Sequence, residues 1–158
     1  MQVIDDAYDR LVRAAIIDSP GVLKSVTDFG ADRTGTLDSI IAIQNAIESL
    51  TLVGGTVFLP SGTYLISQSI ILPSGVSLLG EGAGITSLNA PTSVFPNVTK
   101  IKMVSGTAQP VISIVGTAGN NFNSISIERL AIVGGGNGVV DADGINQVWV
   151  NNTVVRDV

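Results

Sequence analysis

The residue types available for chemistry are limited in this chain. It contains no histidine and no cysteine, which removes imidazole acid–base catalysis, thiol nucleophiles, disulfides and thiolate or imidazole metal sites. The acid–base candidates near the end of the chain are Glu128, Asp141, Asp143 and Asp157, with Arg129 and Arg156 as cationic partners. Two carboxylates across a bond, or one base with a charge-neutralising partner, can carry out acid–base chemistry. Asp141, Asp143 and Glu128 are therefore the candidate catalytic residues.

Charge and composition narrow the class of protein. The net charge is −5 and the eight lysine and arginine residues are scattered, so we expect no nucleic-acid partner. The 18 glycines fall between short runs of Val, Ile, Leu and Thr, a pattern typical of many strands separated by turns. No apolar stretch reaches the roughly 20 residues needed to span a bilayer, so we expect no membrane insertion.

The first predicted helix covers residues 3–17. Its apolar face includes Ile4, Tyr8, Leu11 and Ala15. This face either packs on its own domain or attaches the chain to other copies or to a larger assembly. The acidic residues within residues 1–18 make this segment unlike an export signal.

A second helix is predicted over Asp38–Leu50, after a polar loop, where apolar residues recur at three- and four-residue steps and form one buried stripe. Gly54-Gly55 ends this helix. The remainder of the chain is strand and turn. Strands are predicted at Val22–Val26, Thr56–Leu59, Thr63–Ser67, Ser69–Leu72, Val76–Leu79, Lys100–Val104, Val111–Val115, Ser124–Val133 and Val148–Val155.

An internal repeat indicates a solenoid. Residues 124–132 align with residues 147–155 at an offset of about 23 residues. Glu128-Arg129 and Asn151-Asn152 then occupy equivalent polar corners, which favours solvated bends over an active site. In a parallel β-helix, alternate side chains point into a continuous core and each coil bonds only to its neighbours, so short strands suffice.

The first coil of such a solenoid needs a cover, because its apolar cross-section and unpaired backbone groups would otherwise face water. We expect the Asp38–Leu50 helix to provide it, with Gln44 bonding to backbone groups at the open end. Asp141-Ala142-Asp143-Gly144 is interpreted as a turn. The same two carboxylates could instead hold a hard cation, but calcium takes six or more oxygen ligands, so no metal site is predicted.

Residues 22–84 resemble the opening segment of the pectate-lyase-like superfamily. The matching blocks are VTDFGA at 26–31, AIQNAI at 42–47, GGTVFLPSGTY at 54–64 and LPSGVSLLGEG at 72–82. Two pairs depart from the family pattern: Arg33-Thr34 replaces Gly-Asp and Ser39-Ile40 replaces Asp-Thr, changes expected to alter local capping at a cost of about 1 kcal/mol or less. Gly80-Glu81-Gly82 superficially resembles a phosphate loop, but no helix follows it, so no nucleotide site is predicted.

The resemblance implies an all-β solenoid, a right-handed parallel β-helix with an N-terminal α-helical cap and a preceding short helix. The predicted division is an interaction helix at 1–21, an entry strand and cap helix at 22–55, and the first coils at 56–158. We expect the coils to continue beyond Val158, because a solenoid edge should not end uncovered.

The resemblance also implies a carbohydrate ligand and no cofactor. The favoured interpretation is the N-terminal portion of a phage tailspike-like virion protein, a homotrimer that contacts other tail proteins and binds, with or without cleavage, the host surface polysaccharide. The alternatives are a free secreted polysaccharide lyase or glycoside hydrolase, and a non-catalytic structural adaptor. Trp149, if it points outward, could stack on a sugar or be covered by a neighbouring chain.

Overall fold

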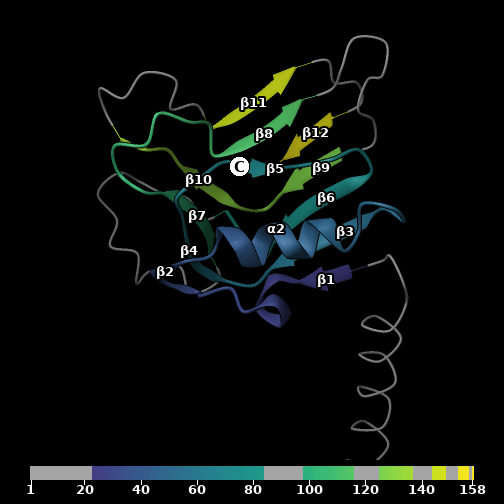
Figure 1. The fold of residues 1–158 in the computed structure, drawn as a ribbon, viewed down its shortest axis with the longest axis horizontal. Coiled ribbons are helices and arrows are strands. Elements are labelled where there is room, and N and C mark those ends of the chain that lie inside the picture. The colour runs from purple at the N-terminus through teal and green to yellow at the C-terminus, as the bar shows by residue number, and fades with distance from the viewer. Residues whose placement is uncertain (1–22, 84–97, 116–124, 137–143, 149–152, 157) are drawn as a thin grey trace, which may run out of the picture.

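The computed structural model describes residues 23–83, 98–115, 125–136, 144–148, 153–156 and 158, and their strands form three sheets (Figure 1). Sheet A contains β1 (Leu23–Ser25), β3 (Gly55–Leu59), β6 (Val76–Gly80), β9 (Ile125–Glu128) and β12 (Thr153–Arg156). Sheet B contains β2 (Thr34–Asp38), β4 (Gly62–Ile66), β7 (Thr99–Met103) and β10 (Ala131–Val133). Sheet C contains β5 (Ile70–Ile71), β8 (Ile112–Val115) and β11 (Ile145–Val148).

All strand pairs in these sheets are parallel, and the chain visits sheets A, B and C in turn. Each circuit is therefore one coil, and each coil lies on the preceding one. The predicted parallel β-helix is confirmed. Among the described residues, no helix has the length and hydropathy of a bilayer-spanning segment.

The core consists of inward-facing side chains that repeat at the same register position in successive coils. In sheet A, Val57 pairs with Leu78 and Leu78 pairs with Ile127, and all three are buried. The equivalent row in sheet C places Ile70 beside Ile112. Fully burying one such aliphatic side chain contributes about 1.5–3 kcal/mol, so these rows hold the coils together.

The structure corrects three details of the strand pattern. Thr34–Asp38 forms strand β2 in place of the predicted polar loop. The sequence did not reveal this strand, because the segment is mostly exposed and lacks an apolar alternation. The predicted strand 124–133 is divided into β9 and β10, and residues 148 and 153–155 belong to two different strands, β11 and β12. The predicted offset of the repeat is wrong. Ile125 pairs with Thr153, which lies farther along the chain than the repeat predicts, because loops of unequal length separate equivalent strands.

Helix α2 (Ile40–Glu48) takes the place that a sheet C strand would have in the first coil. Its Ile43 and Ile47 are fully buried in the core. The side-chain amide of Gln44 donates to the carbonyl oxygen of Ile71 at 3.1 Å and accepts from the Ile71 amide at 3.2 Å. The Gln44 side chain thus supplies the donor and the acceptor that a neighbouring strand would present to β5. The expectation that Gln44 bonds to backbone groups at this end is confirmed.

A carboxylate organises the turn that precedes β2. Asp32 accepts backbone hydrogen bonds from Thr34, Thr36 and Leu37. These bonds hold the pKa of Asp32 well below its usual range, and the bond from the Leu37 amide has the largest effect. Ser39, one of the two departures from the family pattern, does not cap α2 through its side chain; its hydroxyl bonds to the Asp32 backbone instead.

We predict that Gln44→Ala lowers the free energy of unfolding by about 1 kcal/mol, since two backbone groups of β5 lose their partner. Urea denaturation of the chain measures this change. Asn45→Ala, on the exposed face of the same helix, is the matched control and should change stability by less than about 0.5 kcal/mol. Equal effects of the two substitutions would contradict the role assigned to Gln44.

The Asp32 turn predicts a pH dependence. Because the pKa of Asp32 is lower in the folded than in the unfolded chain, its stabilising contribution is complete above the unfolded value of about 4 and is lost as pH falls through the folded value. Asp32→Asn should therefore lower the urea midpoint at pH 7, and its difference from wild type should shrink progressively below about pH 4. Asp28→Asn, at an exposed aspartate of the preceding turn, serves as the control. A difference independent of pH would refute this account.

Candidate functional site

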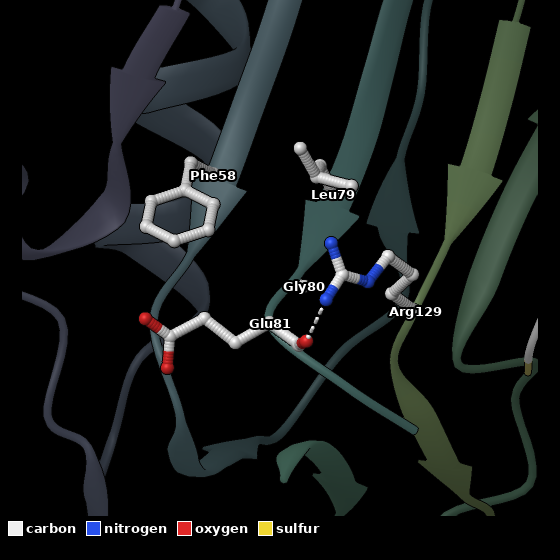
Figure 2. A pocket seen from close by; sticks show the side chains of 5 residues that line it. All are labelled: Phe58, Leu79, Gly80, Glu81 and Arg129. Atoms are coloured by element: carbon white, nitrogen blue, oxygen red, sulfur yellow. Dashed lines mark hydrogen bonds between the residues drawn. The ribbon is translucent and has the colours of Figure 1, made fainter. Parts of the chain in front are cut away.

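An open pocket of about 380 Å³ lies on the outer face of sheet A, where the chain turns toward sheet B (Figure 2). It is lined by Phe58, Leu79, Gly80, Glu81 and Arg129. These residues come from three successive coils that are far apart in sequence. In Figure 2, the Phe58 ring and the Leu79 side chain lie along one side, and Glu81 and Arg129 reach in from the strand ends.

Strand register produces the apolar part of the pocket. Phe58 pairs with Leu79 in adjacent coils, so both side chains point to the same outer face. Their strand neighbours Val57 and Leu78 point inward and are buried. The core rows therefore fix the ring and the leucine side by side on the outside of the solenoid.

The polar part of the pocket lies at the corner between sheets A and B. Arg129 directly follows β9 and has a left-handed backbone conformation, φ 58°, which is unusual for a residue with a side chain. Its amide donates to the carbonyl oxygen of Arg156 at 3.1 Å, and its Nη2 donates to that of Glu81 at 2.6 Å. The guanidinium is thereby held at the pocket by the backbone of the preceding coil.

Glu81 is fixed by both its backbone and its side chain. Its Oε2 accepts from the Ser61 amide at 2.9 Å, and its own amide donates to Thr99 Oγ1 at 2.9 Å. The hydrogen bonds from Ser61, followed by the charges of Arg33 and Arg129, lower the pKa of Glu81. The carboxylate is therefore ionised at neutral pH and can accept hydrogen bonds from a ligand.

A buried tyrosine supports the same corner. The hydroxyl of Tyr64 donates to the carbonyl oxygen of Pro60 at 2.8 Å. Burial, with a smaller contribution from the Glu81 charge, raises the pKa of Tyr64 to about 12. Tyr64 therefore remains a neutral donor and stabilises the bend that carries Ser61.

The combination of groups suits a hydroxylated ring more than bond cleavage. An aromatic face offers apolar contact, an ionised carboxylate accepts hydroxyl hydrogen bonds, and a guanidinium donates them. Among the described lining residues, Glu81 is the one carboxylate, whereas acid–base cleavage of a glycosidic bond uses two. Within the described part of the chain, no group of three or more acidic residues could hold a metal ion.

The predicted site residues are only partly brought together. Glu128 lies on the outer face of β9 in register with Leu79, and its carboxylate accepts from the Ser126 hydroxyl. It does not line the pocket, although its neighbour Arg129 does. Asp141, Asp143, Asp157, Trp149, Ile4, Tyr8, Leu11 and Ala15 lie outside the described residues.

Sequence reasoning missed Phe58 and Glu81 as site residues. Phe58 lies in the all-apolar run 57–59, so strand alternation alone could not assign it to the outer face. Glu81 had one usable signal: it is the charged residue between Gly80 and Gly82 directly after a strand. A turn explains that position equally well, so the signal alone does not indicate a site.

Comparison with known proteins identifies the family. The model of the family "Rhamnogalacturonase A/epimerase, pectate lyase-like" matches residues 23–126. The chain belongs to this family. The pectate-lyase-like resemblance of residues 22–84 is thereby confirmed, and the match extends beyond it into β9.

The proteins similar to this chain include an enzyme and two viral proteins. A mannuronan C5-epimerase of Azotobacter vinelandii is 33% identical over 80% of this chain and 14% of its own length. The tail spike protein of Shigella phage Sf6 is 29% identical over 61% of this chain and 16% of its own length. The solved structure of ORF18 of Geobacillus virus E2 superposes with a TM-score of 0.66 at 23% identity, covering 98% of this chain and 28% of that one. The chain thus spans a small part of each relative.

We predict that Gly80→Ala destabilises the corner. An added Cβ would overlap the carbonyl oxygen of Arg129 and lie 2.9 Å from the Cβ of Thr99, so the coils would have to separate. The expected loss is about 2 kcal/mol of unfolding free energy, measured by urea denaturation. Gly144→Ala is the control, because the nearest atom to its added Cβ lies at 3.7 Å. Equal stability of the two variants would contradict the close packing assigned to Gly80.

Proposed function

We propose that this chain is the N-terminal portion of a phage tail-spike-like protein that binds host surface polysaccharide. The observation that carries the proposal is the pocket formed by Phe58, Glu81 and Arg129, which offers a sugar ring an apolar face, an acceptor and a donor. The similarity to the Shigella phage Sf6 tail spike protein supports a virion location. The single carboxylate among the described lining residues favours binding over cleavage within this segment.

The proposal includes an organisation for the whole protein. Residues 1–21 would attach the protein to other tail components through Ile4, Tyr8, Leu11 and Ala15. Residues 22–55 would start and cover the solenoid, and the coils from residue 56 onward would present the glycan surface. We propose a homotrimer for the full-length protein. If cleavage occurs, Asp141, Asp143 and Glu128 stay candidates for that chemistry. Trp149 stays a candidate for sugar stacking.

A second candidate function is a free extracellular polysaccharide-modifying enzyme, a lyase or glycoside hydrolase. The 34% identity to an alginate lyase of Azotobacter vinelandii over 70% of the chain favours it. A lyase or hydrolase shortens the polysaccharide chain, whereas a tail-spike-like protein that only binds leaves its length unchanged. Size-exclusion chromatography of the polysaccharide after incubation with full-length protein therefore distinguishes the enzyme from a protein that binds without cleavage. The non-catalytic adaptor differs from both in having no affinity for polysaccharide.

We predict that Phe58→Ala in the full-length protein weakens polysaccharide binding roughly fivefold to tenfold, since the sugar loses its aromatic contact. Biolayer interferometry against a panel of bacterial capsular and O-antigen polysaccharides measures the change. Leu52→Ala removes an apolar side chain that is 98% exposed in the loop after α2 and should leave binding unchanged. If Phe58→Ala binds every polysaccharide as tightly as wild type does, the pocket is not the glycan site.

A further inference from the structure

The outer face of sheet B carries two lysines on one strand. Lys100 and Lys102 occupy alternate positions of β7 on either side of the buried Ile101, so both point outward. Their Cα atoms are about 6.6 Å apart along the strand. Lys102 is exposed and Lys100 half-buried, in a chain whose net charge is −5.

The register partners of both lysines in the neighbouring coils are uncharged. Lys100 lies in register between Thr63 and Ala131. Lys102 lies between Leu65 and Val133, the latter 38% exposed.

The next carboxylate along the Lys102 row belongs to Asp38, which pairs with Leu65 and is therefore two strands away from the lysine. It accepts hydrogen bonds from Ser67 and from the amide of Ile40. The two ammonium groups therefore stand on an apolar and hydroxyl-bearing surface.

The two lysines continue the pocket around the corner. Lys100 follows Thr99, whose hydroxyl accepts from the Glu81 amide and whose amide donates to the carbonyl oxygen of Gly82 at 2.8 Å. On the next coil, Ala131 pairs with Lys100 and closely follows Arg129 in the chain. The positively charged side chains thus follow one line from the outer face of sheet A to the outer face of sheet B, in the order Arg129, Lys100, Lys102.

We propose that Lys100 and Lys102 form a second subsite, which binds the carboxylate groups of an acidic polysaccharide whose neighbouring ring occupies the pocket. This inference rests on the proposed function and adds to it a preference for carboxylated glycans. Lysine suits the task because its compact charge on a flexible stem follows carboxylates at varied spacing. The contacts lie at the surface, so salt weakens them.

The test uses the full-length protein and the double variant Lys100→Gln/Lys102→Gln. The probes are alginate and the other carboxylated members of the polysaccharide panel, with neutral members and linear polyphosphate for comparison. The double variant should bind carboxylated polysaccharide roughly fivefold more weakly in low salt. It should also show a shallower dependence of affinity on NaCl concentration and bind neutral polysaccharide as wild type does. Lys24→Gln, in β1 of the first coil, is the single-charge control and should leave binding unchanged.

The outcomes separate this inference from the function on which it rests. If Phe58→Ala weakens binding while the double variant binds carboxylated polysaccharide like wild type, the lysine subsite is wrong and the pocket stands. A wild-type protein with no affinity for any carboxylated polysaccharide also overturns the subsite. If the double variant loses only polyphosphate binding, the lysines recognise phosphate and not a carboxylated glycan. If neither variant affects any glycan, both proposals fail.

Discussion

The in-register stacking of parallel coils is the constraint on which the whole structure depends. The strands are two to five residues long, so each one alone makes few hydrogen bonds and is stable only between neighbours. Register then determines which side of the solenoid each residue occupies, because a shift by one residue would exchange the inner and outer faces. The buried row Val57, Leu78 and Ile127 and the outer pair Phe58 and Leu79 both follow from this register.

Stacking also creates an edge wherever a coil lacks a neighbour. The first coil contains a helix in place of a sheet C strand, so β5 would have unpaired backbone groups on that side. Gln44 closes this gap with one amide group that both donates and accepts. The helix contributes the side chains of Ile43, Ala46 and Ile47 to the core as well.

The corner between sheets A and B is where stacking yields a site with polar groups. Gly80 permits the close approach of the next coil, and Arg129 accepts an unusual backbone conformation to turn toward sheet B. Glu81 is hydrogen-bonded to the preceding coil through the Ser61 amide and to the following coil through the Arg129 guanidinium. Structural bonds therefore hold the charged groups in place before any ligand arrives, which reduces the entropy lost on binding.

The sequence by itself determined the class of architecture and the first helix of the solenoid. Alternating apolar runs, glycine-rich turns and the stripe through Ile43 and Ile47 predicted strands and helix α2, and the blocks in residues 22–84 predicted the family and the parallel β-helix. These signals are local, because strand alternation and helical periodicity are properties of a few adjacent residues. Only the tertiary structure decided which segments pair and where the pocket lies. Gly55 pairs with Val76, whereas Lys100 pairs with the more distant Ala131. The separation along the chain thus differs from pair to pair, because loop lengths between coils vary without changing the stacking, and no single period could reveal the register. The pocket joins side chains from three coils, so its position depended on long-range pairing that local sequence does not encode.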